Sequence, residues 1–230
     1  MVHFTLFGIP VYIRPSFWMV LAIFGGALSI SSVEDLIYPA LFVIAGFVAI
    51  LSHEMGHALV GRKLGGGQQT IVLELFGGLT SSHGMQLTRG GRALMILAGP
   101  MMTLLLGIIS LWLTWNIVAP VMTSYNLNFW DLAISPFTAA LISPKLYILS
   151  CLIMIGEWWT ILNLLPIYPL DGGQLIAQYI RSPRKVFMTG FITAILIGLL
   201  SFQLFHGYFI PIFMALFAYS NYREYKNAPF

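Results

Sequence analysis

Six long apolar runs, separated by short polar segments, are the feature that most constrains the fold of this chain. They cover residues 16–30, 36–60, 93–118, 146–170, 186–205 and 208–222. Runs of about 20 apolar residues suit membrane-spanning helices, whereas the strands of a membrane barrel alternate over about ten residues. Only 8% of the 230 residues are charged, where a soluble domain has about a quarter. The sequence therefore predicts an all-α polytopic membrane protein with about six transmembrane helices, of which the first and last are short.

The distribution of basic residues predicts how these helices are oriented. With the N-terminus in the cytoplasm, ten of the 11 Lys and Arg residues fall in cytoplasmic segments, and only Lys145 lies outside. The positive-inside rule describes this bias. We therefore expect a multi-pass protein of the cell membrane with both termini in the cytoplasm. The net charge of +3 follows from the same bias and does not indicate nucleic-acid binding.

The first apolar run has two interpretations. Arg14 followed by an apolar stretch also resembles a signal peptide, and Ala27-Leu28-Ser29 loosely fits a cleavage site. Cleavage would leave the orientation of the second helix unchanged, so topology does not decide between them. A retained first helix is the preferred interpretation.

The polar connection between the second and third helices predicts a short β-hairpin. Residues 69–78 include β-branched side chains, alternate imperfectly and end in a glycine pair that favours a turn. A hairpin that dips into the membrane could pair with an extended substrate along its edge, whereas an ordinary surface hairpin is the alternative. No low-complexity linker interrupts the chain, so residues 1–230 predict a single domain.

The second apolar run contains the motif His53-Glu54-Met55-Gly56-His57. Side chains four residues apart share one face of a helix, so His53 and His57 are placed as two ligands of one zinc ion require. Glu54 lies beside them, where its carboxylate could take a proton from water activated by the metal. Three ionisable groups within one turn at membrane depth are costly to bury, so we interpret them as functional.

A catalytic zinc site usually has a third protein ligand. The remaining membrane-proximal candidates are Glu74, His83, Glu157, Asp171 and His206. Asp171 is favoured because Pro166 and Pro169 must unwind the fourth helix just before it. The topology also places Asp171 near the same cytoplasmic face as His57. The alternative is an Asp that only ends a helix near the interface, with His83 as the reserve ligand.

Together these motifs resemble the site-2 protease family of intramembrane zinc metalloproteases. The H-E-x-x-H motif inside an apolar run is followed, more than a hundred residues later, by Asn-x-x-Pro-x-x-x-Leu-Asp-Gly. The resemblance implies one zinc ion per chain, held by His53, His57 and Asp171. It gives Glu54 the role of general base. It also implies that Asn163 positions the scissile carbonyl or stabilises its oxyanion.

Other segments agree with this family only in part. Phe76-Gly77-Gly78 resembles the membrane-dipping loop of the family. Family members often carry an Asn after Gly-Pro in the third helix. In this chain Gly99-Pro100 is followed by Thr103 instead. The sequence assigns no role to Thr103 or to Glu157. Gly99-Pro100 itself predicts a kink or a close-packing site. No segment resembles a PDZ or CBS domain, so regulation through such modules is not expected.

The resemblance therefore implies a zinc metalloendopeptidase that acts in regulated intramembrane proteolysis. It would hydrolyse peptide bonds within or near the transmembrane segments of membrane-tethered substrates. The expected partners are a transmembrane protein substrate and membrane lipid, and the oligomeric state is not indicated. A metal-ion transporter and a catalytically inactive membrane scaffold are the alternatives. Transporters tend to show inverted repeats or ionisable residues along a pathway, and neither pattern is evident in this sequence.

Overall fold

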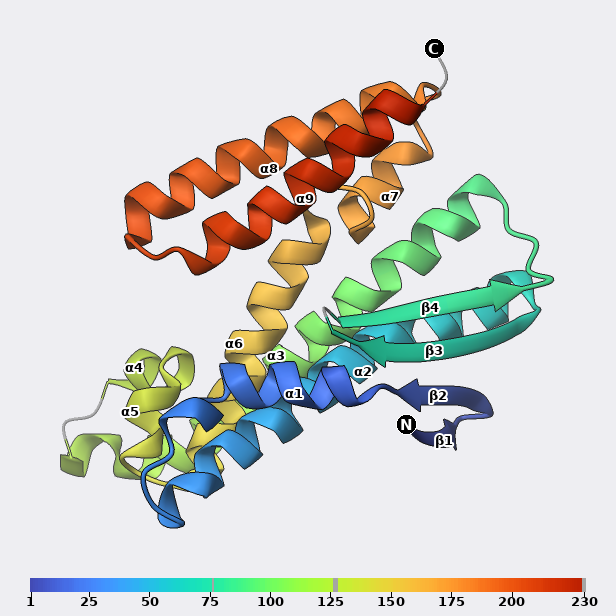
Figure 1. Cartoon of the computed structure of the whole chain (residues 1–230). Coiled ribbons are helices and arrows are strands. Elements are labelled where there is room, and N and C mark those ends of the chain that lie inside the picture. Colours follow the sequence, from blue (N-terminus) through green and yellow to red (C-terminus); the bar gives the residue numbers. More distant parts are fainter. Residues whose placement is uncertain (76, 126–127, 229–230) are drawn as a thin grey trace. The chain divides into compact units, whose positions relative to one another are not determined.

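The computed structural model describes residues 1–75, 77–125 and 128–228 (Figure 1). It divides into two compact units, Met1–Thr160 and Ile161–Phe230. Helices make up most of both units, and the first also contains a small sheet.

The first unit combines strands and helices. Its elements are β1 (Val2–Leu6), β2 (Ile9–Ile13), α1 (Pro15–Phe24), η1 (Ala27–Ser29), η2 (Glu34–Leu36), α2 (Ile37–Gly65), β3 (Gln68–Glu74), β4 (Gly77–His83), α3 (Arg89–Tyr125), α4 (Phe129–Ile134), α5 (Pro136–Ala140) and most of α6 (Pro144–Leu164). The second unit holds the end of α6, α7 (Asp171–Ala177), α8 (Pro183–Phe205) and α9 (Phe209–Asn227).

The described part of the chain contains four helices that are long and apolar enough to cross a membrane. They are Ile37–Gly65, Arg89–Pro120, Pro144–Leu164 and Pro183–Leu204. The expected first span is shorter than the apolar run, because α1 ends at Phe24 and Gly26 follows in the left-handed region with φ +89°. Its 10 residues reach only about 15 Å, half of a hydrocarbon core. The prediction of six spans is therefore confirmed only for the four long helices.

A four-stranded sheet contains the hairpin that the sequence predicts. The expected hairpin is present as β3 and β4, paired antiparallel from Gln68↔His83 to Glu74↔Gly77, while Phe76 lies outside the described residues. The N-terminal strands β1 and β2 extend it in the order β1-β2-β3-β4, with β2 parallel to β3. The prediction of a mostly helical protein with a β-hairpin between the second and third helices is confirmed, and the sheet is larger than predicted. The segment before α1 is folded into this sheet, since β2 pairs with β3.

One face of the sheet packs against α2 (Figure 1). The buried cluster joins Val11, Ile71 and Leu73 of the strands to Met55 and Ala58 of α2. These residues alternate along their strands, as a half-buried sheet requires. The contact brings the sheet to the part of α2 that carries the H-E-x-x-H motif.

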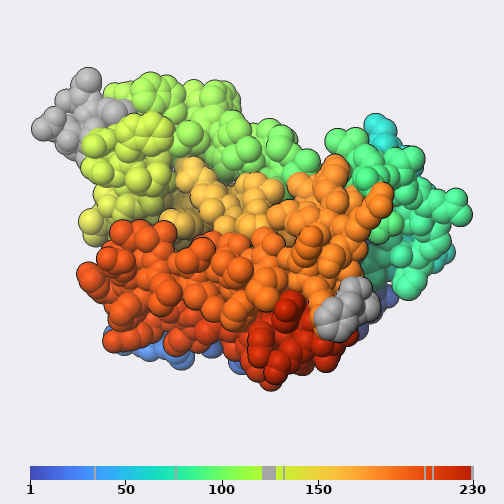
Figure 2. Space-filling view, turned by 90° about the horizontal axis from the view of Figure 1, so that it is seen from above, coloured from blue at the N-terminus to red at the C-terminus, as the bar shows by residue number. Residues whose placement is uncertain are grey.

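The second unit is a helical hairpin with a loop packed against it. Helices α8 and α9 lie side by side (Figure 1), and Figure 2 shows their atoms in orange and red. Ala194, Met214 and Ala218 of this pair share a buried cluster with Ile167 of the loop. The predicted unwinding at the prolines is confirmed, because α6 ends at Leu164 and α7 begins only at Asp171.

Helices α2 and α3 approach so closely that a glycine is required at their contact. A Cβ atom added to Gly56 would overlap the backbone carbonyl of Ala98. A backbone group cannot rotate away as a side chain can, so the helices would have to separate. Gly56 therefore has a packing role inside the H-E-x-x-H motif.

We expect Gly56→Ala to lower the melting temperature of the detergent-solubilised protein. Overpacking of this kind destabilises proteins by about 1–3 kcal/mol. Gly107→Ala is the matched control, because a Cβ atom at Gly107 meets nothing within 4 Å. Equal melting temperatures for the two variants, measured by circular dichroism, would contradict the close contact.

Candidate metal centre

His53 and His57 direct their Nε2 atoms at one point. Both side chains are buried on α2, and the two Nε2 atoms lie 3.1 Å apart. Two nitrogens that bind one zinc ion tetrahedrally at about 2.05 Å are separated by about 3.3 Å. The pair therefore has the spacing of two ligands of one zinc ion, as the sequence predicts.

The ring of His57 is held in the tautomer that zinc binding needs. Its Nδ1 atom lies 2.8 Å from the backbone carbonyl oxygen of Met95 on α3. A carbonyl oxygen only accepts hydrogen bonds, so Nδ1 carries the proton and a neutral ring keeps its lone pair on Nε2. Zinc-bound histidines usually donate their second nitrogen in this way.

Helix α3 leaves room beside these two nitrogens. A Cβ atom at Gly99 would overlap Nε2 of His57 and would lie 2.9 Å from Nε2 of His53. The predicted close-packing role of Gly99-Pro100 is therefore confirmed at the histidine pair. The donor atoms, the fixed tautomer and the absent side chain at position 99 together fit a zinc ion.

Glu54 is covered by strand β4. Its side chain is buried, and its Oε2 atom accepts a hydrogen bond from the Thr80 hydroxyl at 2.8 Å. A Cβ atom on Gly78 would overlap the Glu54 side chain, so the strand reaches the carboxylate only because residue 78 is glycine. Sequence reasoning did not identify Thr80. Its place two residues after Gly78, on the same face of the strand, is the signal that could have found it.

Asp171 is the first residue of α7 in the second unit, and its side chain is only 5% exposed. It begins a helix, which corrects the alternative reading of a helix-ending Asp. With the two buried imidazoles of His53 and His57, its carboxylate supplies the donor types of a catalytic zinc site. Asn163 lies in the last turn of α6 and is also buried.

The other ligand candidates are placed less favourably. His83, Glu157 and His206 are exposed, and Glu74 forms an ion pair with Arg14 at 2.9 Å. His83 is the last residue of β4, five residues or about 16 Å along the strand from the end that covers Glu54. It is therefore poorly suited as a reserve ligand.

Thr103 has a structural hydrogen-bonding role. Its hydroxyl is fully buried, donates to the carbonyl of Pro100 at 3.0 Å and lies 2.8 Å from the hydroxyl of Thr160 on α6. The hydroxyl of Thr160 also lies 3.3 Å from the carbonyl oxygen of Pro100, a proline inside α3. The polar position after Gly-Pro therefore ties α3 to α6.

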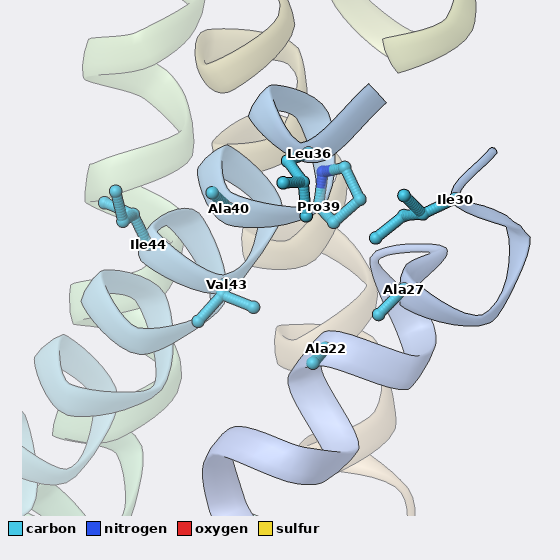
Figure 3. A pocket seen from close by; sticks show the side chains of 8 residues that line it. All are labelled: Ala22, Ala27, Ile30, Leu36, Pro39, Ala40, Val43 and Ile44. Carbon is cyan, nitrogen blue, oxygen red and sulfur yellow. The ribbon is translucent and has the colours of Figure 1, made fainter. Parts of the chain in front are cut away.

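An apolar hollow between α1 and α2 is separate from the histidine pair (Figure 3). It is lined by Ala22, Ala27, Ile30, Leu36, Pro39, Ala40, Val43 and Ile44. The side chains of these residues carry no metal-binding atoms. Along α2, Ile44 is nine residues from His53, which corresponds to about 13 Å.

Known proteins with similar sequences carry the name of zinc metalloproteases. A zinc metalloprotease of Methanocaldococcus jannaschii is 29% identical over 227 residues, which are 94% of this chain and 57% of that protein. Rip3 of Mycobacterium tuberculosis is 30% identical over 132 residues, which are 57% of this chain and 29% of that protein. The chain thus spans only part of the length of these relatives.

A solved structure and a family model agree with these relatives. The site-2 protease from Methanocaldococcus jannaschii has the same fold, with a TM-score of 0.61 and 24% sequence identity over 97% of this chain and 94% of that chain. The model of peptidase family M50 matches residues 41–205, which include both histidines and Asp171. This chain is a multi-pass membrane protein that belongs to peptidase family M50.

Proposed function

We propose that this protein is an intramembrane zinc metalloprotease of the site-2 type, with residues 1–230 acting as one protease domain. It hydrolyses peptide bonds within or near transmembrane segments of membrane-tethered proteins. The observation that carries the proposal is the pair of Nε2 atoms 3.1 Å apart on a helix long enough to cross a membrane. The zinc metalloprotease of Methanocaldococcus jannaschii, similar over 94% of this chain, supports it.

In this proposal His53, His57 and Asp171 hold one zinc ion per chain. Their burial favours tight binding, because a desolvated carboxylate interacts strongly with a cation. Bound zinc supplies Lewis-acid polarisation of a peptide carbonyl and lowers the pKa of water.

Glu54 is the general base of the proposed reaction. Its carboxylate accepts a proton from the attacking water and passes it to the leaving amine. The hydrogen bond from Thr80 holds the carboxylate in one orientation. Asn163, which is buried near the end of α6, positions the scissile carbonyl or stabilises its oxyanion.

The proposed topology has six membrane helices with both termini in the cytoplasm. The apolar segment 16–30, of which α1 is only the first part, and helix α9 join the four long apolar helices in this arrangement. The basic residues support it, because ten of the 11 then lie on the cytoplasmic side. The β3–β4 hairpin dips into the membrane beside Glu54, where it can contact a transmembrane substrate.

Glu54→Gln tests the role of the base. The glutamine amide keeps the shape of the side chain, and its carbonyl oxygen can still accept the hydrogen bond from Thr80. We expect the variant to keep its zinc but to cleave a single-span substrate in proteoliposomes about 100- to 10,000-fold more slowly. Undiminished cleavage would refute the base assignment. Metal flux through the wild-type protein without any cleavage would favour a transporter, and partner binding with neither activity would favour a scaffold.

Asp171→Ala tests the third ligand. Removing one of three protein ligands should reduce the zinc content of the purified protein well below one ion per chain, as measured by atomic emission. His83→Ala is the matched control and should bind zinc like the wild type, because His83 is exposed at the far end of β4. The reverse outcome would make His83 the ligand instead.

Gly99→Ala tests the space beside the two imidazoles. The new methyl group would overlap Nε2 of His57, so we expect zinc affinity in a chelator competition to fall by at least about tenfold, as for other disturbances around a ligand. Gly107→Ala on the same helix should bind zinc like the wild type. Wild-type affinity in Gly99→Ala would show that the ion does not lie beside α3.

A further inference from the structure

The loop that leads into Asp171 is attached to the α8–α9 hairpin at three places. Ile167 is fully buried in the cluster that the two helices share. The Tyr168 ring packs edge-on against Phe187 of α8, with the ring centroids 5.5 Å apart. The carbonyl oxygen of Tyr168 accepts a hydrogen bond from Nδ2 of Asn221 on α9 at 2.7 Å. The loop is therefore held by both helices.

The side-chain amide of Asn221 joins the loop to helix α9. It is only 1% exposed, and its Nδ2 atom also donates to the carbonyl of Phe217, one turn earlier on α9, at 2.9 Å. The two bonds use both hydrogens of the amide and fix its rotamer. A Cβ atom at Gly190 of α8 would overlap Oδ1 of Asn221 and lie 3.3 Å from the backbone nitrogen of Tyr168. The glycine thus leaves the room in which loop and amide meet.

The attachment is transmitted to Asp171 over a very short distance. The backbone N–H of Leu170 donates to the carbonyl of Ile167 at 2.8 Å, which closes the loop into a tight turn. Asp171 follows directly as the first residue of α7. A Cβ atom at Gly173 would overlap the backbone of Ile167, so the first turn of α7 rests on the attached part of the loop. A shift of the loop therefore moves Asp171.

We infer that Asn221 is a positioning residue for the metal centre, which holds Asp171 in place through its hydrogen bond to Tyr168. The inference rests on the proposed function, in which Asp171 is a zinc ligand. It gives the two C-terminal helices an indirect role in metal binding, through the loop that leads into Asp171. A group that orients a ligand typically changes metal affinity by about 10- to 100-fold when it is removed.

Zinc affinity of the full chain in detergent, measured by competition with a chelator, tests this inference without any substrate. Asn221→Leu keeps a similar volume and removes the amide, and it should weaken zinc binding about 10- to 100-fold. Ser201→Ala is the matched control, because the buried Ser201 hydroxyl bonds only to Gly198 of its own helix α8 in the described contacts. It should bind zinc like the wild type.

A double variant separates positioning from a general loss of stability. If Asn221 acts through Asp171, Asn221→Leu adds nothing to the zinc affinity already lost in Asp171→Ala. Additive losses would overturn the inference. If Asn221→Leu does not fold, Gly190→Ala displaces the same amide and is expected to give the same result.

The outcomes also distinguish the inference from the proposed function. Weakened zinc binding in Asp171→Ala with wild-type binding in Asn221→Leu and Gly190→Ala would overturn the positioning role and leave the ligand assignment intact. Wild-type binding in Asp171→Ala would overturn the ligand assignment and the inference with it.

Discussion

The close approach of α2 and α3 is the constraint on which the histidine pair depends. Gly56 lets the backbone of α3 reach α2, and Gly99 keeps the space beside both Nε2 atoms open. The same approach brings the carbonyl of Met95 within 2.8 Å of His57 Nδ1, which fixes the ring. Two histidines one turn apart occur on many helices, but a metal site also needs the tautomer and the space. Helix packing supplies both here, so the site is a property of the helix pair.

The sheet provides a hydrogen-bond donor for the buried carboxylate of Glu54. An acidic side chain at membrane depth needs hydrogen-bond donors, because hydrocarbon offers none. Strand β4 provides one in Thr80 and can come close enough because residue 78 is glycine. The sheet itself is anchored on α2 by the buried cluster that includes Met55 and Ala58. The sheet thus contributes to holding the carboxylate of Glu54.

The sequence predicts those features that follow from spacing and from local backbone chemistry. The helix with the H-E-x-x-H motif, the end of α6 before Pro166 and a hairpin that includes residues 69–78 are of this kind. The β1–β2 strands are not, because each has only five residues and their place depends on parallel pairing with a distant strand. The roles of Thr80 and Asn221 could not be predicted for the same reason, because their hydrogen bonds join residues that are 26 and 53 positions apart in the sequence. Spacing along one helix can be read directly, whereas contacts between segments need the fold.

Helix α9 illustrates why the described residues contain fewer long apolar helices than the six apolar runs of the sequence. It has 19 residues and is not one of the four apolar candidates, since its last turns carry charged side chains. Its Asn221 also lowers its hydropathy, yet this amide is buried and donates to two carbonyls. A polar group with partners inside the protein does not have to be solvated by lipid, so it does not oppose insertion as an isolated amide would. The buried amide of α9 is therefore compatible with a sixth membrane crossing. The same residue, Asn221, attaches the loop that leads into Asp171.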